Sequence, residues 1–114
     1  MRVKNIQPVY FSPTHTSAKI VTAIAEGTDI IVNKEIDLTY PCADQKVIST
    51  DSLAIIGVPT YAGRVAPTAL ERLQKIKGDN TPAIIVVLYG NRDYEDALLE
   101  LRDSVKQLGF VPIA

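Results

Sequence analysis

The sequence has little of what several common functional sites require. Its one cysteine, Cys42, excludes an internal disulfide or a cysteine-ligated cluster, and its one histidine, His15, leaves metal sites and serine–histidine triads short of ligands. A net charge of −1 gives no broad positive field for nucleic acid. No apolar run approaches the ~20 residues of a membrane span, and no secretory signal opens the chain. We therefore expect a cytoplasmic protein without a metal, nucleic-acid or membrane partner.

The pattern that is present alternates short apolar runs with segments of helical period, in a length of 114 residues that suits one domain over residues 1–114. Strands are expected to end at 9–11, to span 33–38, 53–58 and 83–88, and to begin again at 110. Helices are expected over 16–26, from Pro67 through a stripe of Ala69, Leu70, Leu73 and Ile76, and over 94–108. Residues 39–51 are expected to form a loop.

This alternation predicts an α/β fold, a doubly wound parallel sheet with helices on both faces. Such a sheet normally has a further helix after its last strand, and here the sequence ends at Ala114. We therefore expect a truncated piece of a longer protein, or a sheet face covered by a partner chain, as in a homo-oligomer.

The candidate binding site lies in the loops that follow the strands, because ligands of open parallel sheets bind beyond the carboxyl ends of the strands. Four of the six residues in the first loop, 12–17, carry hydroxyl groups, and a helix begins where the loop ends. Hydroxyls and free backbone N–H groups at a helix N-terminus bind phosphate well. The alternative is a simple helix cap, for which one hydroxyl suffices.

The second and third loops, 59–64 and 89–94, contain tyrosines and glycines. Tyr61 can stack on a flat heterocycle, and Gly63 and Gly90 allow close approach of the backbone. The alternatives are an ordinary strand-to-helix turn for the second loop, a helix N-cap for the third, and a core position for Tyr94.

Residues 12–17 resemble the flavodoxin phosphate signature T-x-T-G-x-T, with His15 in place of glycine. Segments 57–67 and 89–94 are similar to the flavodoxin-like half of flavodoxin–ferredoxin fusion proteins of anaerobic bacteria. The resemblance implies a strand order of 2-1-3-4-5, FMN as the cofactor, and electron transfer or a flavin-dependent redox step. The sequence departs from that family in that we expect no final helix. It also implies a redox partner such as a ferredoxin-type protein or domain.

The same resemblance implies a set of cofactor-binding residues and no catalytic residue. The first loop would hold the phosphate and the other two would flank the flavin ring. From their position in or beside these two loops, we expect the cations Arg64 and Arg92 to stabilise the negatively charged reduced ring. The candidates are Ser12, Thr14, His15, Thr16, Ser17, Pro59, Thr60, Tyr61, Ala62, Gly63, Arg64, Tyr89, Gly90, Asn91, Arg92 and Tyr94.

Three other readings share the length or the fold. A receiver domain needs acidic residues at the positions occupied here by 12–14 and 59–60, which have none. A low-molecular-weight phosphatase needs its nucleophilic cysteine directly after the first strand, whereas Cys42 follows the second. The remaining alternative is a flavodoxin-fold binding or assembly module that has lost its cofactor.

Overall fold

The main sheet is a parallel sheet with the strand order β2-β1-β4-β7-β8. The computed structural model describes residues 3–41, 44–61, 64–88 and 94–114. The core strands are β1 (Asn5–Tyr10), β2 (Ile36–Asp37), β4 (Ser52–Tyr61), β7 (Thr81–Leu88) and β8 (Phe110–Pro112). Numbered among themselves, these strands follow the order 2-1-3-4-5, which confirms the predicted doubly wound α/β fold.

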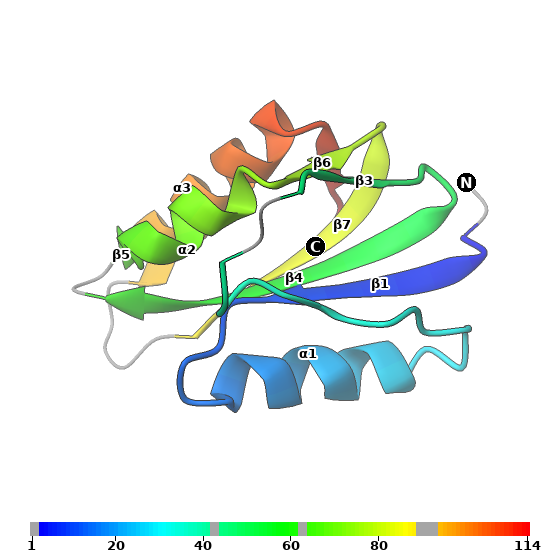
Figure 1. Ribbon diagram of the computed structural model, residues 1–114, viewed down its shortest axis with the longest axis horizontal. Helices are drawn as coiled ribbons and strands as arrows, with labels where there is room; N and C mark the ends of the chain where they lie inside the picture. The colour runs from blue at the N-terminus through cyan, green and yellow to red at the C-terminus, as the bar shows by residue number, and fades with distance from the viewer. Residues whose placement is uncertain (1–2, 42–43, 62–63, 89–93) are drawn as a thin grey trace.

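The helices cover the two faces of this sheet unequally. Helix α1 (Thr16–Glu26) lies alone on one face, and α2 (Pro67–Leu73) and α3 (Tyr94–Gln107) lie on the other (Figure 1). Successive residues of a strand point to opposite faces, so Ile55 packs with the α1 side while Ile56 packs with the α2 and α3 side. Both side chains are fully buried, as the continuous apolar run in β4 predicts.

A second, two-stranded sheet was not predicted. It pairs β3 (Lys46–Ile48) in parallel with β6 (Ile76–Gly78). The predicted loop over 39–51 therefore contains a strand, and the predicted second helix ends at Leu73, so Ile76 belongs to β6 and not to the helix stripe. Ile76 is buried, as a residue of the predicted helix stripe would be. In β3 only Ile48 is buried, and a single buried residue gives the sequence no hydrophobic period from which a strand could be predicted.

The edge strand predicted over 33–38 is shorter than expected. Only Ile36–Asp37 form β2, although an isolated bridge joins Val32 to Ile6 of β1. Short, interrupted edges of this kind limit pairing with another chain.

The α1 face carries apolar side chains that no helix among the described residues covers completely. Ile84 and Val86 of β7 are half-buried on this side. Phe110 of β8 packs on the α3 side, so alternation points Val111 and Ile113 to the α1 side, where they are 42% and 55% exposed. This apolar surface over β7 and β8 is the face that the sequence predicted to lack a helix.

Candidate functional site

The winding of the sheet reverses between β1 and β4, and the loop after β1 begins the site. From β1 the chain proceeds to β2 on one side and then to β4 on the other, which makes the carboxyl end of these two strands the switch point. Residues 11–15 connect β1 to α1 at this point, and the N–H of Phe11 still donates to the carbonyl of Gly57 in β4, at 3.1 Å. The N-terminus of α1 is therefore held at the edge where ligands of such sheets bind.

His15 gives the loop its turn. It is the N-cap of α1 and adopts a left-handed backbone conformation, with φ 66° and ψ 0°, and its side chain caps nothing. Its N–H donates to the carbonyl of Ser12 at 3.1 Å, which closes the turn. Glycine is the residue that adopts this conformation without strain, and histidine is among the side chains that tolerate it. The position where the flavodoxin signature has glycine thus has the backbone geometry that glycine favours.

Ser12 caps the helix in place of His15. Its side-chain oxygen accepts the N–H of Ala18 at 3.0 Å, and its own N–H donates to Oγ1 of Thr39 at 2.8 Å. Ser12 is 4% exposed. The capping alternative therefore applies to this one residue of the loop, which supports the loop from behind.

Of the other three hydroxyls of the loop, those of Thr14 and Thr16 lie on its outer side, whereas the side chain of Ser17 is buried, at 2% exposed. Thr14 and Thr16 are exposed, with their Oγ1 atoms 3.4 Å apart. Among the described residues, no acceptor contacts the backbone N–H groups of Thr16 and Ser17. Two hydroxyls and two unused N–H groups at the positive end of a helix form a set of donors suited to an oxyanion.

The segment after β4 is not the ordinary strand-to-helix turn that was the alternative for the second loop, because a further strand follows β4 before α2 begins. β4 continues to Tyr61 and pairs in antiparallel fashion with β5 (Arg64–Val65), joining Thr60 to Val65 and Tyr61 to Arg64. The Oγ1 of Thr60 donates to the carbonyl of Leu88 at the end of β7, at 2.8 Å. This bond ties the second loop to the strand from which the third loop departs, so the predicted residues Pro59 and Thr60 brace the edge of the sheet.

Arg64 is bound to Glu100 of α3. The guanidinium donates to both carboxylate oxygens, with Nε 3.3 Å from Oε1, and the N–H of Val65 donates to the same Oε1 at 3.0 Å. The hydrogen bond from Arg64 lowers the pKa of the Glu100 carboxyl, burial opposes this shift, and the Val65 N–H adds to it. The positive charge of Arg64, one of the two that we expected beside a flavin ring, is therefore already paired, and Arg92 lies outside the described residues.

Substituting Glu100 should change how stability depends on pH. Because the folded protein holds the Glu100 proton less tightly than the unfolded chain does, the stabilisation is complete above about pH 5 and is lost as the pH falls through the lower folded pKa. We expect Glu100→Gln to unfold at lower urea than wild type at pH 7, with the two midpoints converging toward pH 3 or so. Glu71→Gln, at an exposed position of α2, is the control. A constant difference between wild type and Glu100→Gln at every pH would contradict the expectation.

Comparison with solved structures places this architecture among known folds. A flavodoxin from the domain Archaea matches 96% of this chain and 78% of its own length with a TM-score of 0.59, at 14% identity. The fold is flavodoxin-like. A protein from Bacteroides uniformis designated a flavoprotein matches 98% of this chain and 88% of its own with a TM-score of 0.66, at 16% identity. The flavodiiron protein of Giardia intestinalis matches 97% of this chain and 31% of its own with a TM-score of 0.57, at 21% identity.

At the level of sequence, no family profile and no curated protein matches this flavodoxin-like chain. In the part of the chain that the structure describes, no helix is long and apolar enough to cross a membrane, and no group of three or more His, Cys, Asp or Glu residues could hold a metal ion.

Many of the residues predicted to flank a flavin ring, in the second and third loops, lie outside the residues that the structure describes. Tyr61 and Tyr94 are placed only by their backbone, at the end of β4 and the start of α3. Of the predicted binding residues, those outside the described ranges are Ala62, Gly63, Tyr89, Gly90, Asn91 and Arg92, and Cys42 and Asp93 lie outside them as well.

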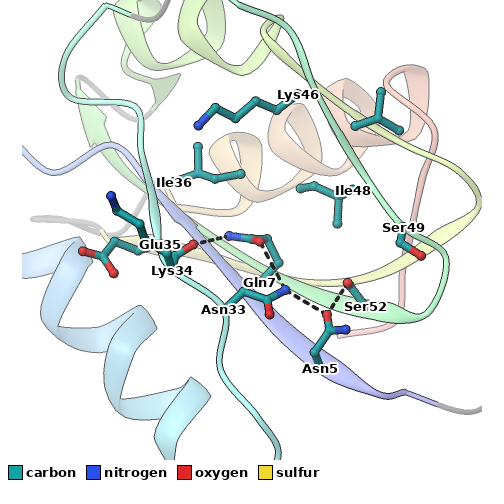
Figure 2. A pocket seen from close by; sticks show the side chains of 11 residues that line it. Asn5, Gln7, Asn33, Lys34, Glu35, Ile36, Lys46, Ile48, Ser49 and Ser52 are labelled. Carbon is teal, nitrogen blue, oxygen red and sulfur yellow. Dashed lines mark hydrogen bonds between the residues drawn. The ribbon is translucent and has the colours of Figure 1, made fainter.

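A polar hollow of about 460 Å³ lies at the opposite end of the strands (Figure 2). Asn5 and Ser52 stand at the amino ends of β1 and β4, and the Oδ1 of Asn5 accepts both the hydroxyl of Ser52 and the Nδ2 of Asn33. Nε2 of the buried Gln7 donates to the carbonyls of Pro8 and Lys34. These side chains satisfy one another, so the hollow is a structural polar network and separate from the loop at residues 12–17.

Proposed function

We propose that this flavodoxin-like domain binds FMN non-covalently and transfers electrons, with the phosphate held by residues 12–17. The observation that carries the proposal is the left-handed turn at His15. It starts α1 at the switch point of the sheet, where the N–H groups of Thr16 and Ser17 have no acceptor among the described residues and the hydroxyls of Thr14 and Thr16 are exposed.

The donor set fits a phosphate monoester without a cation in the loop. A phosphate group offers three acceptor oxygens and carries a charge of about −1.5 to −2, which the helix dipole and neutral donors can stabilise where water has limited access. Ser12 is occupied by Ala18 and Thr39, so we assign the direct contacts to Thr14, Thr16 and the backbone N–H of Ser17, whose side chain is buried. His15 is exposed beside them and stays a candidate for a contact with the phosphate.

The ring would lie between the second and third loops, as the resemblance of the sequence implies. We propose that Tyr61 and Tyr89 flank the flavin ring and that the backbone of residues 62–64 and 90–92 approaches its edge. Thr60 would hold the two loops at a fixed separation through Leu88. The flavin supplies the redox chemistry when it is bound, and the protein positions it and sets its potential.

The proposed partners follow from this role. They are FMN, an electron-transfer protein or domain of the ferredoxin type, and a second copy of the chain on the apolar surface over β7 and β8. The solved structures described above show the fold alone, so these partners rest on the resemblance and the site.

Titration with FMN and riboflavin tests the phosphate site directly, because the two ligands differ only in the phosphate. We expect quenching of flavin fluorescence to saturate with FMN at a Kd about 100-fold below that for riboflavin. The double variant Thr14→Val/Thr16→Val removes two donors to a charged group and should weaken FMN binding by about tenfold or more, with riboflavin unchanged.

Thr22→Val is the matched control, since Thr22 is an exposed threonine farther along α1. It should bind both flavins as wild type does. Equal affinity for FMN and riboflavin would overturn the phosphate assignment. If neither flavin quenches, FMN binding by this chain is wrong and the cofactor-free binding module takes its place.

A further inference from the structure

Arg72, near the end of α2, reaches the segment that follows β2. Its Nη1 donates to the carbonyl of Leu38 at 2.8 Å and to the carbonyl of Thr39 at 2.7 Å. These two carbonyls are about 34 residues before Arg72 in the chain, so the bonds join distant segments. Both hydrogens of one guanidinium nitrogen are thus used on adjacent backbone oxygens.

The same guanidinium lies over the ring of Phe11, with Cζ 5.9 Å from the ring centroid. Phe11 is buried and directly precedes the loop at Ser12. No carboxylate pairs with Arg72 in the described part of the chain. The guanidinium of Arg72 is half-buried, and three contacts hold it: two backbone carbonyls and the face of an aromatic ring.

From Thr39 the contacts continue into the loop. The N–H of Thr39 donates to Oδ1 of Asp37 at 2.9 Å, which fixes the threonine, and its Oγ1 accepts the N–H of Ser12. Ser12 in turn accepts the N–H of Ala18 on its side-chain oxygen. The contacts therefore connect Arg72 through Thr39 and Ser12 to the first turn of α1.

We infer that Arg72 is a positioning residue for the phosphate site, an inference that rests on the function proposed above. It holds Thr39 where Thr39 can take the N–H of Ser12, and Ser12 then takes the N–H of Ala18. By capping α1, Ser12 sets the direction of the N–H groups of Thr16 and Ser17. These are the groups that we propose to bind the phosphate. Lysine cannot replace this arrangement fully, because it lacks the planar group that stacks on Phe11 while donating to two carbonyls.

Two substitutions at different points of this connection test the inference. Arg72→Met keeps the length of the side chain without its donors, and Thr39→Val removes the acceptor of the Ser12 N–H. In the protein without flavin, hydrogen exchange measured by NMR should accelerate about tenfold at the amides of Ser12 and Ala18 in both variants, with Ile56 and Ile85 in the central strands as internal references.

The flavin titration provides the second readout. We expect the ratio of the riboflavin Kd to the FMN Kd to fall about tenfold in Arg72→Met and in Thr39→Val, and the double variant to be no worse than either. For Arg72→Lys, we expect a ratio of the riboflavin Kd to the FMN Kd between those of wild type and Arg72→Met. Arg102→Met is the matched control, because Arg102 is an exposed arginine of α3 that forms an ion pair with its neighbour Asp103 at 3.6 Å.

The two hypotheses fail in different ways. If wild type does not distinguish FMN from riboflavin, the proposed function fails and the inference about the phosphate fails with it. If wild type does distinguish them, and folded Arg72→Met keeps both the wild-type ratio and slow exchange at Ser12, the positioning role of Arg72 alone is overturned. Thr39→Val decides the case if Arg72→Met does not fold.

Discussion

Gly109→Ala should lower the free energy of unfolding by about 3 kcal/mol, through two independent effects. Gly109 follows α3 with φ +97°, a conformation that strains any residue with a β-carbon. A Cβ built at Gly109 would also lie 2.3 Å from the carbonyl oxygen of Gly78. Urea denaturation followed by circular dichroism measures the loss.

The neighbouring backbone cannot yield at this contact. The N–H of Gly78 donates to the carbonyl of Leu108 at 2.8 Å, which fastens β6 against the end of α3. A methyl group at Gly109 would have to separate these two segments, and with them β6 from the start of β8. The effect is therefore larger than that of a glycine-to-alanine change at an open turn.

Gly27→Ala is the matched control, because Gly27 also ends a helix. Its φ is −69°, an ordinary helical value, and the nearest atom to a built Cβ is the Ala23 carbonyl oxygen at 3.4 Å. We expect this variant to be within about 1 kcal/mol of wild type, and to be more stable if anything. Similar midpoints for Gly109→Ala and wild type would show that the contact with Gly78 can relax.

The helices and central strands were predictable because burial leaves a period in the sequence. In α3, Ala97, Leu101 and Val105 recur every four residues and are all fully buried. The central strand β4 is buried on both faces, so its run of apolar residues was recognisable without any pattern of alternation.

The small β3–β6 sheet could not be predicted for the opposite reason. In β3, Val47 is 71% exposed although apolar, and Lys46 is exposed as well, so the segment has the composition of a loop. In β6 the buried Ile76 stands three residues after Leu73, which is the spacing of a helix. Pairing between two such segments is a tertiary effect that local composition does not encode.

The residues of the candidate site likewise fall into those that the local sequence suggests and those that only tertiary contacts bring to the site. Its first loop was proposed from local residues, and the structure adds that His15, at the glycine position of the signature, has a left-handed backbone. The residues that support the loop were missed, since Thr39 contacts Ser12 across 27 residues and Arg72 contacts Thr39 across 33. Glu100 was missed for the same reason, because a charged residue on a helix is ordinarily exposed and its bond to Arg64 spans 36 residues.

Gly57→Ala should cost about 2 kcal/mol of stability, because α1 packs against β4 at Gly57 without room for a Cβ. A Cβ at this position would lie 2.3 Å from Cγ2 of Val21, which is fully buried. Valine in a helix has one strongly preferred side-chain rotamer, so Val21 cannot turn away. The helix would have to move from the sheet instead.

A double-mutant cycle with Val21→Ala separates this clash from other effects. Val21→Ala alone should destabilise the protein by about 2 kcal/mol through the cavity it leaves. In the Gly57→Ala background the same change removes the obstructing methyl group, so it should cost less by about 1–2 kcal/mol. Additive effects of the two substitutions would mean that α1 is not held at this distance by Gly57.

The same substitution connects packing to the proposed site. Gly57 lies beside the first turns of α1, since the carbonyl oxygen of Ser17 would be 3.8 Å from the new Cβ, and its own carbonyl accepts the N–H of Phe11. Moving α1 outward would shift the N–H groups of Thr16 and Ser17 away from the loop that Ser12 and Thr39 hold in place. We therefore expect Gly57→Ala to weaken the binding of FMN more than the binding of riboflavin. The double variant Gly57→Ala/Val21→Ala should recover part of the FMN affinity, because α1 can again pack closely on the sheet. Recovery of stability without recovery of FMN affinity would separate the packing of α1 from the binding of phosphate.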